Sequence, residues 1–396
     1  MEGVSTEGIY LGSAVCATLA PALYVWVWER RGGGHLLWLW AVSTLALQGQ
    51  LYMWGFHGVF GVLAVCCTLC VYCLTIRDVN EVLYMGGKSV LITGCDTGFG
   101  HALAKELCHR GVRVFAGVLD VNSSGALELK KHGPPCLHVL QLDVTDHSQV
   151  DQAYRDISAA AAQVGEEGLW GLVNNAGVLG CTADAELLPF ATFRSCIEVN
   201  FLSAVHLCQV FLPLLRRSKG RIVNVASMGG EVPFRCFSAY GASKAALGHF
   251  SRVLRLELAD WGVKVVVIQP AGFRTSIFKD CEDSKRTIIQ NLPPDICNDY
   301  GGTYICSLQD GLSKAGQQSA QDLSPVVEDM CHALTSAFPK PLYTPGQMAW
   351  LLPFLYHLWP TALSNKLITC HKFVNCDPAE EVISAPSLNA FNPKAG

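Results

Sequence analysis

The side chains best suited to chemistry occur in one stretch, SMGGEVPFRCFSAYGASK at 227–244. Tyr240 and Lys244 are four residues apart, so on a helix their side chains lie on the same face, one turn from each other. An ammonium group beside a phenol stabilises the phenolate, so the spacing predicts that Lys244 lowers the pKa of Tyr240 from its usual value of about 10. A phenol tuned in this way can act as a general acid or base near neutral pH.

Ser227 could complete the same site. It precedes Tyr240 by 13 residues and follows RIVNVA (221–226), a run typical of a buried strand. At the carboxyl end of that strand its hydroxyl would face the pocket that holds the phenol. Tyr-x-x-x-Lys arises by chance in many helices, so the pair has weight only with supporting sequence upstream.

Such supporting sequence lies at 88–110. KSVLIT (88–93) is typical of a strand, TGCDTGFG (93–100) of a glycine-rich turn, and HALAKELCHR (101–110) of a helix. Glycines let the backbone approach a pyrophosphate, which the N-terminus of the following helix then stabilises. The order strand, turn, helix therefore predicts a dinucleotide site. Its expected cofactor-binding residues are Thr93, Gly94, Thr97, Gly98, Phe99 and Gly100.

Acidic residues follow the next two predicted strands. Asp120 comes after a strand at 112–119, where a carboxylate can bind the ribose hydroxyls and repel a 2′-phosphate. It therefore favours NAD over NADP, although a solvated Asp that opens a turn is the alternative. After a third strand, LHVLQ (137–141), we expect Asp143 near the adenine with Val144 beside it.

A fourth strand at 168–173 leads into the turn Asn174–Gly177. Strands that alternate with helices predict a parallel sheet covered by helices on both faces. Open sheets of this kind bind ligands at the carboxyl ends of their strands. The expected cofactor-binding residues here are Asn175, Ala176 and Gly177. Asn200 falls late in a helix expected from about Thr192, and alone it would more often be a structural hydrogen-bonding residue.

These motifs occur in the order of a known family. Over roughly 88–275 the chain resembles the short-chain dehydrogenase/reductase family, through TGCDTGFG, NNAG, Asn200, Ser227 and the pair Tyr240 and Lys244. The resemblance implies a Rossmann-like, doubly wound parallel α/β sheet of about seven strands, and hydride transfer to or from a nicotinamide. It implies that Tyr240 is the acid/base, that Lys244 holds the nicotinamide ribose, that Ser227 binds the reacting oxygen and that Asn200 anchors a water relay.

The same resemblance adds the segment PAGFRT (270–275) to the cofactor site. Thr275 would hold the carboxamide, next to Pro270 and Gly272. Tyr240 and Lys244 would contact the cofactor as well, and the substrate would lie against Ser227 and Tyr240. The chemistry needs no metal, and the sequence offers no cluster of metal-ligating residues.

Within the family the chain is similar to the membrane-anchored hydroxysteroid dehydrogenases that act at the 17-beta position. The similar stretches include VFAGVLDVNSSGALEL (114–129), FLPLLRRSKGRIVNVASMGG (211–230) and YTPG (343–346), whereas ADAELLPFATFRSC (183–196) is more similar to the 11-beta kind. The resemblance implies NAD-dependent oxidation of estradiol to estrone and of testosterone to androstenedione. The alternatives are an 11-beta-hydroxysteroid or retinol dehydrogenase, and an inactive nucleotide-binding membrane scaffold.

The first 80 residues are expected to anchor the chain in a membrane. Residues 9–28 and 35–76 contain no Asp, Glu, Lys or Arg, which is enough for two or three spans of ~20 residues. Arg30, Arg31 and Arg77 favour the cytosolic side, so the catalytic domain would be cytosolic. Spans of modest length favour a thin membrane, such as the endoplasmic reticulum.

Composition limits the remaining possibilities. The 396 residues carry a net charge of −4 without a basic block, which argues against a nucleic-acid partner. The 18 cysteines are scattered without paired zinc spacings, and we expect them to be reduced.

The dehydrogenase domain itself is expected at 81–346, with a substrate lid in 277–322. The hydrophobic segment 347–377 would form a helix that Pro353 interrupts. This helix would lie on the membrane surface, or be packed in the core or in a homodimer interface. Residues 378–396 are expected to be disordered.

Overall fold

The computed structural model describes residues 81–132, 136–163, 168–278, 292–300, 304, 316–317 and 319–370. The predicted anchor at 1–80 and the predicted disordered tail at 378–396 lie outside these residues.

Seven parallel strands form one sheet in the order β3-β2-β1-β4-β5-β6-β7. The predicted Rossmann-like fold is therefore confirmed. The central strands are buried on both faces, which is why apolar residues predominate in them without a regular alternation of apolar and polar residues. The strands are β1 Ser89–Ile92, β2 Arg113–Val118, β3 Leu137–Gln141, β4 Gly171–Asn174, β5 Arg221–Val225, β6 Lys264–Ile268 and β7 Leu342–Tyr343.

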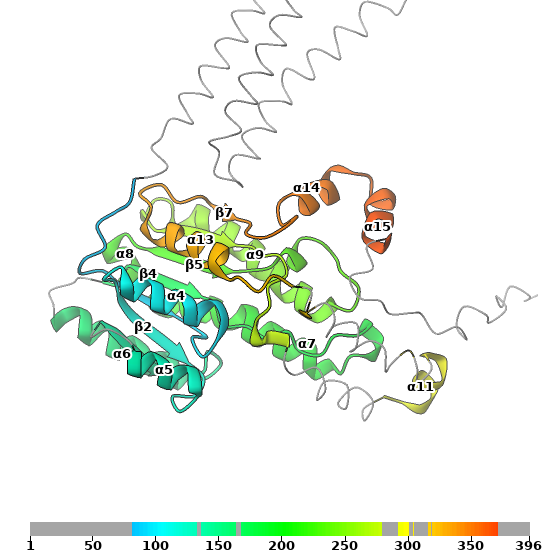
Figure 1. Ribbon diagram of the computed structural model, residues 1–396, viewed down its shortest axis with the longest axis horizontal. Coiled ribbons are helices and arrows are strands. Elements are labelled where there is room, and N and C mark those ends of the chain that lie inside the picture. The colour runs from blue at the N-terminus through cyan, green and yellow to red at the C-terminus, as the bar shows by residue number, and fades with distance from the viewer. Residues whose placement is uncertain are drawn as a thin grey trace, which may run out of the picture.

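Helices cover both faces of this sheet (Figure 1). Val90 and Ile92 of β1 belong to the core beneath α4, α5 and α13, while Leu91 between them belongs to the core beneath α6, α8 and α9. Successive residues of a strand point to opposite faces, so β1 contributes to both cores. The helices are α4 Gly98–His109, α5 Ser124–His132, α6 His147–Gln163, α7 Phe190–Ile197, α8 Ser203–Ser218, α9 Ser238–Leu258, α11 Pro294–Tyr300 and α13 Ser324–Thr335.

Within the part of the chain that the structure describes, one helical stretch, Phe190–Ser218, is long and apolar enough to cross a membrane by length and composition. It consists of α7, a π-helical turn η2 (Glu198–Leu202) and α8. Its second half packs against the sheet, with Leu207 and Phe211 fully buried in the core shared with α6. The apolar composition of α8 is thus that of a core helix.

A buried arginine fastens α13 to the sheet. The Arg221 guanidinium, at the start of β5, donates hydrogen bonds to the carbonyls of Ala333 at 2.7 Å and Ser336 at 2.6 Å. It also lies 4.8 Å from the ring centroid of Trp170, whose indole N–H donates to the Leu334 carbonyl at 2.9 Å. These contacts satisfy carbonyls at the end of α13, at the edge of the sheet where β5 begins.

The C-terminal hydrophobic segment differs from the prediction. It forms two helices, α14 Leu351–Leu358 and α15 Thr361–Cys370, separated by Trp359 and Pro360. Pro353 does not interrupt α14, because it lies in the first turn of the helix, where its missing N–H leaves no hydrogen bond unmade. The prediction of a break at this residue was therefore wrong.

Candidate active site

A cavity of about 460 Å³ opens at the carboxyl ends of the strands. Its walls come from the loops that follow β1, β2, β3, β4, β5 and β6, which lie far apart in the sequence. Parallel strands bring these loops to one edge of the sheet, as the sequence predicted. The expected site residues that line the cavity are Gly94, Thr97, Gly98, Phe99, Asp143, Val144, Asn175, Ala176, Gly177, Ser227, Tyr240, Lys244, Pro270, Gly272 and Thr275.

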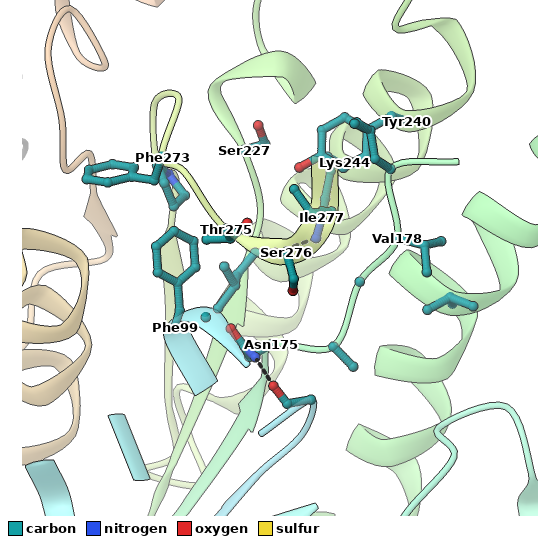
Figure 2. A pocket seen from close by; sticks show the side chains of 18 of the residues that line it. Phe99, Asn175, Val178, Ser227, Tyr240, Lys244, Phe273, Thr275, Ser276 and Ile277 are labelled. Atoms are coloured by element: carbon teal, nitrogen blue, oxygen red, sulfur yellow. Dashed lines mark hydrogen bonds between the residues drawn. The ribbon is translucent and has the colours of Figure 1, made fainter. Parts of the chain in front are cut away.

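The three residues expected to do chemistry lie together (Figure 2). Ser227 follows β5 by two residues and precedes the short helix η3 (Met228–Gly230), and its hydroxyl accepts a hydrogen bond from the Gly229 N–H at 3.1 Å. Tyr240 is in the first turn of α9, and Lys244 is one turn later. The local structure therefore places a hydroxyl, a phenol and an amine at one end of the cavity.

The Lys244 amine is buried beneath the site. Its Nζ donates a hydrogen bond to the carbonyl of Val225 at 2.8 Å and lies 5.9 Å from the centroid of the Tyr240 ring. Burial lowers the pKa of Lys244 to about 8, because a charged amine loses its hydration there. At neutral pH the amine is therefore still mainly protonated.

The pKa of Tyr240 moves in the direction opposite to the prediction. Burial raises it, and this effect outweighs hydrogen bonding with Ser227, which lowers it. The prediction that Lys244 lowers the pKa was wrong, because the amine faces the Val225 carbonyl and burial destabilises its own charge. Ser227 is the neighbour that favours the phenolate in this structure.

Asn200 supports the site from behind the cavity wall. It lies in the π-helical turn η2, a type of helix irregularity found frequently at functional sites. Its amide oxygen accepts from the Val178 N–H at 2.8 Å, and its amide nitrogen donates to the Val178 carbonyl and to the Ser243 hydroxyl, both at 2.9 Å. Ser243 in turn donates to the carbonyl of Tyr240 at 2.7 Å. Asn200 thus ties the loop after β4 to the first turn of α9.

The glycine-rich turn fits a dinucleotide. Gly94 and Gly98 have φ values of +68° and +64°, which disfavour any other residue. A Cβ atom on Gly94 would lie 2.9 Å from the Cα of Ala176, and one on Gly100 would lie 2.5 Å from the Gly94 carbonyl oxygen. Thr97 is the N-cap residue of α4, but its side chain forms no capping hydrogen bond with the described residues. The backbone N–H groups in the first turn of α4 therefore remain available to a phosphate.

Four of the predicted site residues do not line the cavity that the described residues form. They are Thr93, Gly100, Asp120 and Asn200. The hydroxyl of Thr93 accepts from the N–H groups of Asn175 at 3.1 Å and Ala176 at 3.0 Å, so Thr93 joins β1 to the loop after β4. This residue therefore shapes the cofactor site without reaching the cavity.

Asp96, which the sequence analysis missed, organises the end of the cavity next to the loop after β2. It lines the cavity, and its carboxylate accepts hydrogen bonds from the Leu119 N–H at 2.8 Å, the Asp120 N–H at 3.4 Å and the Ser123 hydroxyl at 3.2 Å. Asp120 itself is exposed and accepts from the Asn122 N–H at 2.8 Å, as a turn-opening Asp would. An acidic residue within the glycine-rich turn is the signal that could have revealed Asp96.

Comparison with known proteins identifies the family. The family described as "short chain dehydrogenase" matches residues 88–286, which is half of the chain. The chain belongs to the short-chain dehydrogenase family. It is an oxidoreductase that acts on CH–OH groups, and the fold and glycine-rich turn of this dehydrogenase serve to bind a nicotinamide dinucleotide.

Two relatives and one solved structure show how far the similarity extends. The dehydrogenase is 44% identical to human 17-beta-hydroxysteroid dehydrogenase type 2 over 74% of its own length and 75% of that protein. It is 44% identical to bovine 11-beta-hydroxysteroid dehydrogenase type 2 over 71% of its own length and 70% of that protein. A short-chain dehydrogenase/reductase from Burkholderia phymatum, solved in complex with NAD, shares the fold at 22% identity, with a TM-score of 0.58, and covers 69% of this chain and 94% of that one.

The dehydrogenase has an aromatic wall beside Tyr240, which the sequence analysis also missed. Phe234 and Phe237 line the cavity, with ring centroids 6.4 Å apart, and Phe237 is 6.1 Å from the ring of Tyr240. Cys236 between them has a φ of +68°, a strained conformation for a residue with a side chain. The spacing of three residues between Phe234, Phe237 and Tyr240 was the available signal.

A second aromatic pair lies farther from Tyr240 (Figure 2). Phe99 and Phe273 pack edge to face at 5.7 Å, as the labelled rings in Figure 2 show. Beside them the short helix η4 (Ser276–Phe278) crosses the glycine-rich turn, where the hydroxyls of Thr97 and Ser276 are hydrogen-bonded. Among the described residues, no three His, Cys, Asp or Glu side chains are grouped to hold a metal ion.

Proposed function

We propose that this dehydrogenase oxidises the 17-beta-hydroxyl group of steroids with NAD, converting estradiol to estrone and testosterone to androstenedione. The observation that carries the proposal is the position of Ser227 and Tyr240 beside the aromatic wall of Phe234 and Phe237. A flat, largely apolar molecule that presents a hydroxyl group at one end matches such a surface. The 17-beta position is supported by the 44% identity to the human 17-beta-hydroxysteroid dehydrogenase.

The residues of the chain have separate tasks in this reaction. Ser227 holds the substrate hydroxyl by a hydrogen bond, and Tyr240 as phenolate accepts the proton of that hydroxyl. When bound, a nicotinamide would accept the hydride from the carbon that bears this hydroxyl. Because burial raises the pKa of Tyr240, the fraction of phenolate and hence the oxidation rate should increase with pH.

The cofactor would be held by residues along the whole cavity. The first turn of α4 after Gly98 would bind the pyrophosphate, Lys244 the nicotinamide ribose and Thr275 the carboxamide. At the adenosine end, the carboxylates of Asp96 and Asp143 line the cavity and Asp120 lies next to it. Negative charge at this end disfavours the 2′-phosphate of NADP, which supports the choice of NAD.

Residues 1–80 would anchor the enzyme in the endoplasmic reticulum membrane, with the dehydrogenase domain in the cytosol. Their long uncharged runs support this part of the proposal. Lipophilic substrates such as steroids partition into membranes, so an anchored enzyme would meet them there.

A second candidate function is oxidation of an 11-beta-hydroxyl group. The bovine 11-beta-hydroxysteroid dehydrogenase is as similar in identity as the human 17-beta enzyme. The segment 183–196, which is more similar to the 11-beta kind than to the 17-beta kind, forms η1 (Ala185–Leu187) and most of α7 and packs close to Cys236 and Ala239 next to the cavity. This segment is therefore placed to influence which end of a steroid reaches Tyr240.

A substrate panel separates the candidates. Microsomes that contain the full chain are given estradiol, cortisol or retinol, each with NAD or NADP, and the products are analysed by mass spectrometry. The proposal predicts estrone formed with NAD. Absence of estrone, with cortisone or retinal formed instead, would overturn the assigned substrate.

The catalytic role of Tyr240 needs its own variant. Tyr240→Phe should retain nucleotide binding, measured by NADH fluorescence, and lose turnover. Unchanged turnover in this variant would overturn the role of the phenol. If the wild-type chain binds nucleotide and oxidises none of the substrates tested, the inactive scaffold becomes the better account.

A further inference from the structure

Exposed apolar side chains gather on two segments at opposite ends of the described sequence. Of the thirteen large apolar side chains that are exposed in the described residues, six lie within 82–84 and 338–363. Scattered exposed apolar residues are normal, but a shared location is not. The six are Val82, Tyr84, Phe338, Met348, Leu358 and Leu363.

Backbone hydrogen bonds bring the beginnings of these two segments together. Residue 82 forms an antiparallel bridge with Ser336, the Leu83 N–H donates to the Thr335 carbonyl at 2.8 Å, and the Ala337 N–H donates to the Glu81 carbonyl at 2.8 Å. Figure 1 shows the blue segment that begins the coloured ribbon on the same upper side of the domain as α14 and α15. The two segments that contain the six exposed apolar residues therefore lie on one side of the domain.

The C-terminal segment on this side contains no charged residue of its own over 25 positions. Residues 341–365 contain no Asp, Glu, Lys or Arg, although they include the surface helices α14 and the first half of α15. A surface helix in water normally has a charged or polar face. The segment also contains Trp350, Tyr356 and Trp359, residue types that favour the interface between lipid and water.

The uncharged runs at 9–28 and 35–76 indicate that a lipid bilayer could cover this side. They end at Ile76, only five residues before Glu81, which is hydrogen-bonded to the same edge of the domain. Five residues span at most ~18 Å. A bilayer that holds the anchor must then lie close to this edge, whereas α14, with eight residues, is far too short to cross it.

We propose that residues 82–84 and 338 together with helices α14 and α15 form a surface that lies on the lipid bilayer, with the apolar side chains at the boundary between headgroups and acyl chains. This inference rests on the proposed membrane anchor. It assigns the C-terminal helices to the membrane rather than to the core or a dimer interface.

The membrane surface is linked to the catalytic loop. His357 of α14 contacts the Glu231 carboxylate at 3.2 Å, and Arg252 of α9 forms an ion pair with the same carboxylate. Glu231 directly follows η3, the short helix that begins after Ser227. Contact of α14 with lipid therefore restrains the position of the loop that binds the substrate hydroxyl.

Photo-crosslinking of the full chain in microsomes tests the proposal. The photoreactive residue p-benzoylphenylalanine is introduced in place of Leu358 or Leu363, and in matched controls in place of Leu127 on α5 or Leu256 on α9, which are also exposed. After irradiation, peptides with lipid adducts are counted by mass spectrometry. We expect roughly tenfold more lipid adduct at positions 358 and 363 than at the controls.

Two other results would overturn the proposal. Equal lipid adduct at all four positions would show no preferred membrane surface, and crosslinks from positions 358 and 363 to a second copy of the chain would show a dimer interface. Carbonate extraction of the same microsomes tests the anchor separately. Release of the chain by carbonate contradicts the anchor, whereas retention without lipid adducts contradicts only this inference.

Discussion

At the scale of single residues, a position can require glycine for its backbone conformation or for lack of space, and Gly94 and Gly111 allow the two effects to be compared. Both have positive φ values, +68° and +76°, but a Cβ atom on Gly94 would lie 2.9 Å from the Cα of Ala176, whereas one on Gly111 would meet nothing in the described structure within 4 Å. Gly111→Ala should therefore lower the free energy of unfolding only through the unfavourable backbone conformation, by about 1–2 kcal/mol. Gly94→Ala adds a collision at the cofactor site.

We expect Gly111→Ala to retain NADH binding and Gly94→Ala to lose it. Fluorescence titration with NADH measures binding, and thermal unfolding in detergent checks that both variants are folded at the titration temperature. Equal binding by two folded variants would contradict the assignment of the 93–100 turn to the cofactor.

Burial of Lys244 has a consequence for stability at high pH. Its pKa is about 8 in the folded protein and about 10.4 in an unfolded chain. Between these values the unfolded chain binds more protons, so the free energy of unfolding rises as the pH rises through this window. Compared with Lys244→Met, the nucleotide-free wild type should gain roughly 2 kcal/mol between pH 8 and about pH 10.

Chemical denaturation at several pH values measures this difference. The variant provides the baseline, because all other titrating groups are common to both proteins. Parallel stability curves for the two proteins would show that the Lys244 amine is not buried as described.

The sequence predicted that three candidate catalytic residues lie together, but not what surrounds them. The order and spacing of Ser227, Tyr240 and Lys244 predicted that they would meet, and they do. The direction of the Tyr240 pKa shift depends on burial and on where the lysine amine points. Both are set by the packing of β5 against α9, which residue spacing does not reveal.

At the scale of elements, the Arg221 contacts make the attachment of α13 testable. Arg221→Leu removes two charged hydrogen bonds to carbonyls and leaves those carbonyls buried, so it should lower the free energy of unfolding by about 2–4 kcal/mol. Arg217→Leu, at an exposed position on α8, is the matched control and should change it little.

Thermal unfolding of both variants gives the comparison. The KM for NAD should stay unchanged in Arg221→Leu below its unfolding temperature, because Arg221 lies at the opposite end of β5 from the cavity. Equal shifts in unfolding temperature for the two variants would contradict the role of the buried guanidinium.

Regular elements were predictable where one local rule decides them. The buried central strands are short apolar runs, and the glycine-rich turn starts α4 where the pattern indicated. The C-terminal helices were not predicted correctly, because Pro353 was interpreted as a helix break although it lies in the first turn of α14. A sequence rule for proline requires the helix start, and that start follows from tertiary structure.

At the scale of the whole molecule, topology makes one cavity from six distant loops. The sequence predicted this gathering, because the carboxyl ends of parallel strands must share one edge. It did not predict Asp96, Phe234 or Phe237 as parts of the cavity. Their positions depend on loop conformations, such as the positive φ of Cys236, that have no pattern in the sequence.

The central claim is that Tyr240 and a bound nicotinamide together oxidise a steroid at C17. The most direct measurement uses estradiol that carries deuterium in place of the C17 hydrogen, incubated with NAD and microsomes that contain the full chain. Mass spectrometry should find estrone together with deuterium in the reduced nucleotide, and neither with Tyr240→Phe. Reduced nucleotide without deuterium, or a product that keeps deuterium at C17, would contradict the account.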